Sequence, residues 1–479
     1  MERIREINAD ILQMFPPAPT EAADILLSQE LKKNSAKIVV LDDDPTGVQT
    51  VHHVSVYTHW DKESIRSGFA EAGRLFYILT NSRGMTAAQT EVIHRQIGES
   101  VSQVAKEQNR DFLIISRSDS TLRGHYPLET EILRQAIESG TGKEIDGEVI
   151  CPFFKEGGRF TIGGVHYVKY GSRLVPAGET EFARDKTFGY RSSRLGDYVE
   201  EKTQGRFTAG EVIDIALEDL RAMDLDKIEK QLLSVSGFQK IIVNAADYTD
   251  IKVFCTALYR AMAKGKYFLF RSAAALVKEM GGIPDKPLLT RAEMIVKENP
   301  CGGVVIVGSH TRKTTEQLEE LRKVPGLKFV EFNSDLVLDE KKFAQETDRV
   351  IREMESAVSG GQTVVVYTRR RLLTVENDTK ESALLRSIRI SQGVQSLVAS
   401  LRAEPSFIIA KGGITSSDIG TKALNVRCAQ VMGQIRPGIP VWQTGEESRF
   451  PSMPYVIFPG NVGEKETLRE ALEVLIGYR

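Results

Sequence analysis

Three consecutive carboxylates, Asp42, Asp43 and Asp44, follow the apolar run at 38–41 and precede a Pro-Thr-Gly turn. An apolar run of this kind is typical of a buried parallel strand, and open α/β sheets bind ligands where their strands end. Adjacent carboxylates repel one another, so the triplet favours a neighbouring cation, ligand hydroxyl or basic side chain. The alternative is a solvated acidic turn that caps a helix through Asp44 or Thr46.

A second polar cluster, Ser116 to His125, follows the apolar run at 112–115, and Arg83 stands near the end of a third such run. An arginine fork suits a carboxylate or phosphate, because it gives two parallel charge-assisted hydrogen bonds. Asp and Ser side chains can hold sugar-like hydroxyls. The pattern predicts a site for a small hydroxylated acid, with a helix N-cap and a structural salt bridge of Arg123 as the alternative. The residues assigned to this site are Arg83, Arg117, Asp119, Ser120, Arg123 and Gly124.

A segment rich in Gly and aromatic residues, 157–167, includes Arg159 and His166. It could close over a substrate, or it could be an ordinary hairpin with Gly at positive φ. His166 and His125 are candidate acid-base groups, although a lone His is more often structural. The longer stretch 157–205 lacks clean periodicity, which is typical of a functional or mobile loop.

Three Gly-containing turns follow apolar runs in the second half of the chain, and each precedes a predicted helix. Backbone N–H groups at such turns can cradle phosphates, and a helix N-terminus adds a partial positive charge. Any single turn of this kind also serves an ordinary strand-to-helix connection. Three of them together favour a nucleotide phosphate site, which we assign to Ser309, Gly412, Gly413, Thr415, Gly460, Asn461 and Gly463.

Alternating strands and helices must position these clusters. In the first half, the pattern predicts a helix at 86–106 and strands at 38–41, 75–79, 112–115 and 241–243. In the second half, it predicts helices at 315–323, 339–356 and 382–401 and strands at 304–307, 364–367, 406–410 and 455–458. We therefore expect two three-layer α/β domains with mainly parallel sheets, separated in the Gly-Pro stretch at 281–288. The expected domains are 1–282, in which 1–30 is a helical lead-in, and 283–479.

Composition narrows the class of protein. The 479 residues are 41% hydrophobic and 27% charged, as in ordinary globular proteins, which excludes a disordered chain or a collagen. Lys+Arg number 63 and Asp+Glu 65, and this near-neutral balance argues against nucleic-acid or membrane partners bound by bulk charge. The cysteines are far apart, which indicates neither a zinc site nor a disulfide framework and favours a cytoplasmic location: Cys151, Cys255, Cys301 and Cys428.

Several catalytic motifs are absent from the sequence. There is no GxxxxGK[ST], no GxGxxG, no GxSxG and no HExxH. An oxidoreductase or lyase that acts on a small hydroxy acid would also suit two α/β domains with an Arg-rich site, but the missing GxGxxG disfavours it. A catalytically inactive sugar-acid sensor is a further alternative.

The ordered motifs resemble those of the four-carbon acid sugar kinases. Asp43 to Gly47 resembles the DDxTG signature of that family, and Arg117 to Gly124 resembles its K-x-DSTLRG motif. Gly158-Arg159 with 164–167 resembles its GR…GxHY segment, and the three C-terminal turns resemble its nucleotide-domain turns. The family usually has Ala where Asp42 stands and Lys where Arg117 stands.

The resemblance implies a sugar-acid domain followed by an ATP domain, with the active site in the interdomain cleft. It implies ATP-dependent phosphorylation of a hydroxyl of a D-threonate, D-erythronate or 3-oxo-tetronate type of acid. Arg83, Arg117, Arg123 and Arg159 would bind this acid, and Asp43 or Asp44 would orient the attacking hydroxyl and accept its proton. Mg²⁺ would accompany ATP and is held mostly by phosphates and water, so no residue is assigned as a metal ligand. The sequence leaves open whether the protein forms a homodimer.

Overall fold

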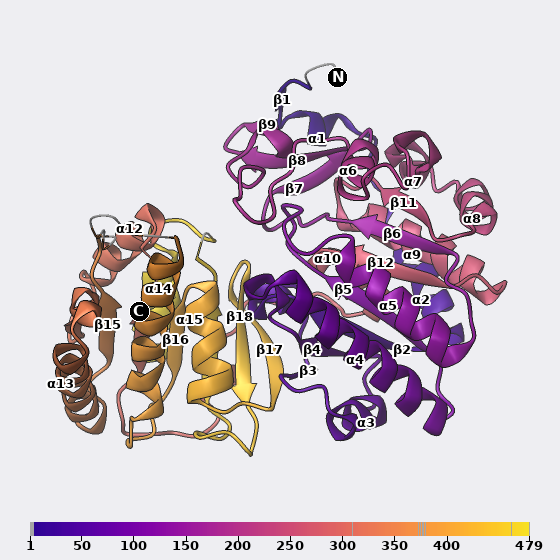
Figure 1. Cartoon of the computed structure of the whole chain (residues 1–479). Coiled ribbons are helices and arrows are strands. Elements are labelled where there is room, and N and C mark those ends of the chain that lie inside the picture. Colours follow the sequence, from indigo (N-terminus) through magenta and orange to yellow (C-terminus); the bar gives the residue numbers. More distant parts are fainter. Residues whose placement is uncertain are drawn as a thin grey trace. The chain divides into compact units, whose positions relative to one another are not determined.

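The computed structural model describes residues 4–308, 310–371, 373, 375, 378, 380–460 and 462–478. The chain divides into two compact units (Figure 1), one formed by 1–47 with 59–285 and the other by 48–58 with 286–479. The predicted α/β class, with mainly parallel sheets in two domains, is confirmed. The structure places 48–58 in the second unit, whereas the sequence pattern placed this segment inside the domain 1–282.

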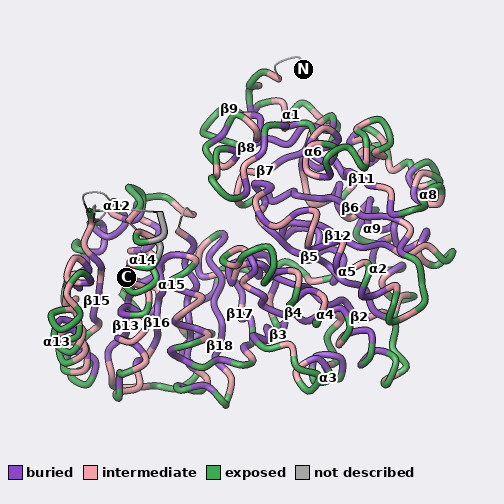
Figure 2. Tube along the Cα trace, viewed as in Figure 1, coloured by how far each residue is buried: buried purple, intermediate pink, exposed green. Residues whose placement is uncertain are grey.

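The main sheet of the first unit is parallel, and its strands are buried along their whole length at its centre (Figure 2). Helices α4 and α5 pack together in front of it in Figure 1, and α2 packs against α9. Burial on both faces explains the continuous apolar runs. The strand order is β10 (Ile213–Ile215), β11 (Gln239–Val243), β6 (Gly147–Cys151), β12 (Phe268–Ser272), β5 (Phe112–Arg117), β2 (Lys37–Asp42) and β4 (Leu75–Leu79).

The segment expected to be a long loop, 157–205, instead contains regular structure. It forms the antiparallel strands β7 (Arg159–Ile162), β8 (Val165–Tyr170) and β9 (Arg173–Pro176), and then helix α6 (Leu195–Lys202). Gly163 and Gly164 connect β7 to β8 with φ of 56° and 72°. A two-residue hairpin turn of this type needs positive φ at both positions, so the Gly pair specifies the hairpin.

The sheet of the second unit is mixed. Its parallel part has the order β19 (Pro454–Phe458), β16 (Ile408–Lys411), β13 (Val304–Val307), β15 (Val364–Thr368) and β14 (Lys328–Phe332). On the other side of β19 lie the antiparallel strands β18 (Ile439–Thr444), β17 (Cys428–Arg436) and β3 (Val54–Tyr57). Strand β3 comes from the segment 48–58, so the first half of the chain contributes a strand to the second unit.

The predicted helices form with small shifts at their ends. The helix expected at 86–106 is α4 (Ala87–Glu107), which begins after a capping box of Thr86 and Gln89. The lead-in contains β1 (Ile7–Asn8), which pairs with β9, and two helices. Within the described residues, no helix is long and apolar enough to span a membrane. The remaining helices are α1 (Ile11–Met14), α2 (Thr20–Lys33), α3 (Lys62–Ala70), α5 (Leu128–Thr141), α7 (Leu217–Arg221), α8 (Leu225–Ser234), α9 (Tyr248–Ala263), α10 (Ala274–Gly281), α11 (Arg291–Met294), α12 (Arg312–Leu321), α13 (Glu340–Ser359), α14 (Lys380–Ala399), α15 (Gly413–Asp418) and α16 (Thr467–Ile476).

Candidate functional site

The aspartate triplet lies where β2 ends, between the ends of β4 and β5. Asp42 pairs with Leu79 of β4 on one side and with Arg117 of β5 on the other. Asp42 and Asp43 are buried, whereas the Asp44 side chain keeps 17% of its surface exposed. The register thus brings a carboxylate and a guanidinium from distant segments together at one edge of the sheet.

Two arginines pair with the carboxylates of the triplet. Arg83 donates to Asp43 through Nη2 at 2.6 Å and Nε at 3.2 Å, and its Nη1 lies 3.4 Å from Asp44 Oδ2. Arg117 Nη1 lies 3.1 Å from Asp42 Oδ1 and 3.9 Å from Asp43 Oδ1. Arg83 and Arg117, which the sequence pattern assigned to the substrate, are therefore paired with the chain's own carboxylates.

The three carboxylates have different electrostatic environments. Burial raises the pKa of Asp42 to about 7, although Arg117 opposes this shift. The pKa of Asp44 lies below its usual range, because Arg83 and Thr46 together outweigh the effect of burial. Thr46 donates to Asp44 Oδ1 from its backbone N at 2.9 Å and from its hydroxyl at 2.6 Å. Asp44 is therefore the more ionised of these two carboxylates and the more accessible.

The loop after β5 contacts the triplet through Ser118, whose hydroxyl donates to Asp43 Oδ2 at 2.7 Å. Gly124 ends this loop with φ of +123°, and a Cβ there would lie 2.8 Å from Ser118 Oγ and from Arg271 Nη2. Arg271 donates to Glu129 at 2.5 Å and approaches the backbone carbonyl of Arg123 at 3.3 Å. Gly124 leaves room for these contacts, which hold the loop in place.

Arg271 was missed by the sequence analysis. It lies on β12 in register with Ser116 of β5, so it reaches the same edge of the sheet. The apolar residues before it in β12 were an available signal, because they mark another buried strand that ends in polar residues.

Asp119 and Arg123 form an ion pair across one turn of the loop, with Arg123 Nε 2.6 Å from Asp119 Oδ2. The Thr121 hydroxyl also donates to this oxygen. Although burial opposes the shift, Arg123 and Arg83 hold the pKa of Asp119 far below its usual range. Ligand hydroxyls can therefore donate hydrogen bonds to the ionised Asp119 carboxylate.

The two candidate histidines are bonded to backbone carbonyls. His166 Nε2 donates to the carbonyl of Ser120 at 2.7 Å, and burial lowers the His166 pKa to about 4. His125 Nε2 lies 3.0 Å from the carbonyl of Met85 and 3.1 Å from that of Ser82. These contacts support the structural role for both, and His166 fixes the backbone at Ser120.

Arg159 carries a positive charge without a carboxylate partner in the described part of the chain. Its guanidinium lies 5.5 Å from the ring centre of Phe182, and that of Arg123 lies 5.0 Å from the same ring. Arg159 Nη1 donates to the carbonyl of Gly157, whereas its Nε is buried with no hydrogen-bond partner. Burial lowers the Arg159 pKa, and the charge of Asp119 only partly offsets this. An anion beside Phe182 would supply the missing counter-charge.

These groups belong to one charged cluster. The negative charge of Asp119 contributes to the raised pKa of Arg83 and also acts on Arg159. Asp119 therefore acts electrostatically both on the arginine that holds the triplet and on the arginine beside Phe182. Such a cluster offers both anionic and cationic groups to a ligand that carries hydroxyls and a carboxylate.

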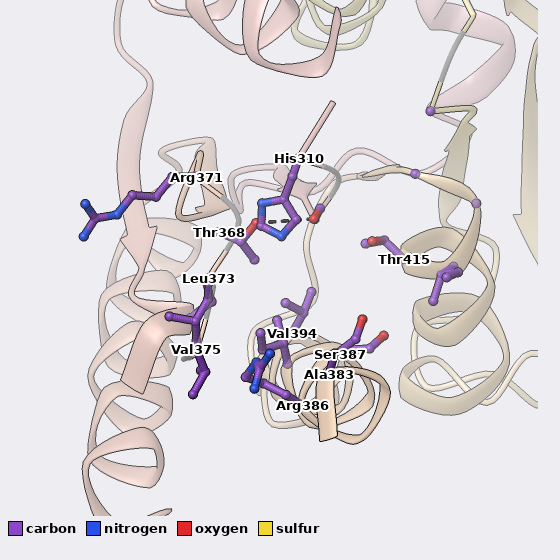
Figure 3. A pocket seen from close by; sticks show the side chains of 18 of the residues that line it. His310, Thr368, Arg371, Leu373, Val375, Ala383, Arg386, Ser387, Val394 and Thr415 are labelled. Atoms are coloured by element: carbon purple, nitrogen blue, oxygen red, sulfur yellow. Dashed lines mark hydrogen bonds between the residues drawn. The ribbon is translucent and has the colours of Figure 1, made fainter. Parts of the chain in front are cut away.

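A separate cavity of about 450 Å³ lies in the second unit (Figure 3). Among the residues predicted to bind nucleotide, Gly412, Gly413, Thr415 and Gly460 line it, and Gly463 does not. Ser309 and Asn461 lie outside the described residues. The cavity thus brings together turns that follow three different strands, β13, β16 and β19.

The turn after β16 presents unpaired donors to this cavity. The N–H groups of Gly413, Ile414 and Thr415 have no acceptor among the described residues, and the first bond of this turn runs from Ser416 N to Gly412 O at 2.8 Å. Gly412 has φ of +117°, a value that favours glycine. A Cβ at Gly308 would lie 2.3 Å from Thr415 Oγ1. Glycine at position 308 therefore allows the turn after β13 to approach the turn after β16.

Apolar side chains line the other end of the cavity, together with the paired Arg386 and Asp378. Leu373 and Val375 face Ala383 and Val394 of α14 in Figure 3, whereas Thr415 lies on the opposite side. Arg386 of α14, which lies beside these side chains, is paired with Asp378. The cavity therefore combines amide donors with an apolar surface that suits a flat ring. The α14 residues were missed because helical periodicity does not indicate which face lines a cavity.

Comparison with known proteins defines the class. Residues 38–280 match the model of a sugar-binding N-terminal domain, and residues 304–468 match that of a nucleotide-binding C-terminal domain. The chain is thus a two-domain protein that pairs sugar binding with nucleotide binding. It belongs to the four-carbon acid sugar kinase family.

The individual proteins that are similar to this chain share at most a fifth of their residues with it in the sequences compared below. The chain is 20% identical over 346 residues to D-erythronate kinase of Heliobacterium modesticaldum, which covers 70% of this chain and 71% of that protein. The crystal structure of Haemophilus influenzae protein HI1011 is similar with a TM-score of 0.58 at 17% identity, over 91% of this chain and 100% of that one. A Salmonella typhimurium LT2 protein, described as a candidate tRNA synthase, gives a TM-score of 0.63 at 16% identity over 91% and 98% of the two chains. These structures share the fold.

Proposed function

We propose that this protein is an ATP-dependent kinase that phosphorylates a hydroxyl of a four-carbon sugar acid. D-threonate, D-erythronate and 3-oxo-tetronate are the substrate types. The observation that supports this proposal most directly is the unneutralised Arg159 guanidinium, which lies in one charged cluster with Asp119 and the aspartate triplet. A small acid that carries hydroxyls matches these groups in charge and in hydrogen-bonding capacity.

The substrate carboxylate binds Arg159 and Arg123 beside the Phe182 ring. Asp119 accepts hydrogen bonds from its hydroxyls, and Ser120 and Gly124 shape the loop around them. Arg83 and Arg117 keep the aspartate triplet in place rather than bind the acid directly, because both already pair with it. Arg123 also pairs with Asp119, so Arg159 is the one of these four arginines that lacks a carboxylate partner among the described residues.

Asp44 is the group that orients the attacking hydroxyl and accepts its proton. Both oxygens of Asp43 already accept hydrogen bonds, from Arg83 and from Ser118. Among the described residues, Asp44 Oδ2 has only the 3.4 Å contact with Arg83, and the side chain is partly exposed. A weakly basic carboxylate suffices, because phosphoryl transfer depends mainly on positioning and on charge neutralisation.

ATP binds in the cavity of the second unit, with its phosphates at the turn amides of Gly413, Thr415 and Gly460 and its base at the apolar end. The cavity volume lies in the usual range for small-molecule sites. The described residues contain no cluster of three or more His, Cys, Asp or Glu that could hold a metal ion. We therefore expect Mg²⁺ to be held by the phosphates and water, with one or two carboxylates at most.

The test is a coupled ADP-release assay over a panel of four- and five-carbon sugar acids, with the phosphorylated position determined by NMR. We expect acid-dependent ADP release for at least one four-carbon acid and little ATP hydrolysis without acid. Folded protein that binds ATP but releases no ADP with any of these acids would contradict the proposal. The homodimer and the cytoplasmic location stay predictions from the sequence.

A further inference from the structure

Lys411 is a fully buried lysine beneath the nucleotide cavity. It ends strand β16 and directly precedes Gly412, which lines the cavity. Its Nζ donates to the carbonyl of Pro459 at 2.5 Å and to that of Gly460 at 3.3 Å, and it lies 4.2 Å from the ring centre of Phe458. Lys411 therefore links the turn after β16 to the turn after β19.

This ammonium group has no carboxylate partner among the residues described. Lys313 of α12 is the charged side chain that acts on it, whereas Phe458 of β19 and Val307 of β13, its neighbours in the sheet, are uncharged. Burial, together with Lys313, lowers the Lys411 pKa to about 6. A charged lysine in such a place is costly unless an anion compensates it.

The contacts of Lys411 also orient a peptide group. The Pro459–Gly460 peptide is trans, so its N–H points to the side opposite the Pro459 carbonyl. Because that carbonyl faces Lys411, the Gly460 N–H faces away from it, and this N–H has no acceptor in the described structure. Gly460 lines the cavity, so its amide is available to an anion there.

We infer that Lys411 is a positioning residue of the nucleotide site: it fixes the turn after β19 so that the Gly460 amide meets the nucleotide phosphates, which in turn supply its counter-charge. This inference rests on the proposed nucleotide binding. The opposing interpretation is that Lys411 only fills space at the end of β16 and has no electrostatic link to a ligand.

The charge of Lys411 couples nucleotide binding to proton uptake. Burial lowers the pKa of Lys411 in the free protein, and bound phosphates would favour its charged form. Nucleotide binding therefore takes up a proton, and affinity falls as the pH rises above the Lys411 pKa of the free protein. A lysine that only fills space would show neither effect.

The experiment measures ADP binding by calorimetry at pH 7 to 8 in buffers of different ionisation enthalpy, which gives the number of protons taken up. We expect Lys411→Met to weaken ADP binding roughly tenfold or more and to reduce proton uptake relative to the unmodified protein. Lys411→Arg should restore affinity in part but not proton uptake, because arginine stays protonated. Lys411→Gln is a second neutral variant in case the methionine variant does not fold.

The matched control is Lys422→Met, which removes an exposed lysine of the same unit that is paired with Asp418. This variant should bind ADP and take up protons like the unmodified protein. Unchanged ADP affinity and proton uptake in folded Lys411→Met or Lys411→Gln would overturn the inference and leave the kinase proposal intact. Failure of the unmodified protein to bind ADP or ATP would instead overturn the proposed function.

Discussion

Arg83 and Asp43 form a two-point ion pair, with Arg83 Nη2 and Nε at 2.6 and 3.2 Å from the two carboxylate oxygens of Asp43. The Asp43 side chain is 3% exposed and that of Arg83 is 21% exposed. This pair joins the end of β2 to the short turn after β4. It separates the roles of neighbouring carboxylates, because Asp43 is saturated by Arg83 and Ser118, whereas Asp44 retains accepting capacity.

Asp43→Asn should therefore mainly reduce the stability of the fold, whereas Asp44→Asn should mainly reduce turnover. Removal of the Asp43 charge leaves Arg83 without its main partner, and we expect a loss of about 3 kcal/mol in the free energy of unfolding. Asp44→Asn should cost less stability than Asp43→Asn, because the contact of Asp44 with Arg83 is longer at 3.4 Å, and it should lower kcat by about 10²- to 10⁴-fold. Urea unfolding and steady-state kinetics with the active acid measure the two effects. Near-normal turnover of a folded Asp44→Asn variant would contradict the assigned role.

Arg159→Met should raise KM for the sugar acid about tenfold to a hundredfold, because a charge-assisted contact with the carboxylate is lost. The melting temperature should not fall, since the native guanidinium is buried without a carboxylate partner in the described chain. The control is Arg173→Met, which removes an exposed arginine of β9 that pairs with Glu6. An equal rise of KM in both variants would show that Arg159 has no specific role.

Gly124→Ala should destabilise the loop after β5 more than Gly142→Ala destabilises the end of α5. Both glycines have positive φ, +123° and +70°, so both substitutions incur backbone strain. Only at Gly124 would the new Cβ also lie 2.8 Å from Ser118 Oγ and Arg271 Nη2, whereas the space at Gly142 is open. We expect an additional loss of about 1–3 kcal/mol for Gly124→Ala by thermal or urea unfolding. Equal losses of unfolding free energy in the two variants would mean that the loop accommodates the new methyl group without further destabilisation.

Asp42 should make the protein less stable as the pH rises. Two guanidinium groups face three carboxylates, so one carboxylate lacks a counter-charge, and burial raises the pKa of Asp42 to about 7. A carboxyl group whose pKa is higher in the folded state stabilises the fold at low pH, and this contribution is lost as the pH rises from about 4 to about 7. In Asp42→Asn this part of the pH dependence should be absent when unfolding free energies are compared between pH 5 and pH 8. The same slope in both proteins would contradict the assignment.

The sequence alone was sufficient to predict the α/β class, the eight strands marked by apolar runs and the glycine turns that follow three of them. These features depend on local patterns: continuous apolar runs specify buried parallel strands, and the Gly163-Gly164 pair specifies the hairpin of β7 and β8. Tertiary structure decided which charges pair. Spacing along the chain could not reveal that Arg83 and Arg117 pair with the aspartate triplet while Arg159 does not, because strand register and helix packing set those distances. For the same reason, only the fold brought Arg271 to the loop after β5, Lys411 to the carbonyl of Pro459, and the segment 48–58 to the sheet of the second unit.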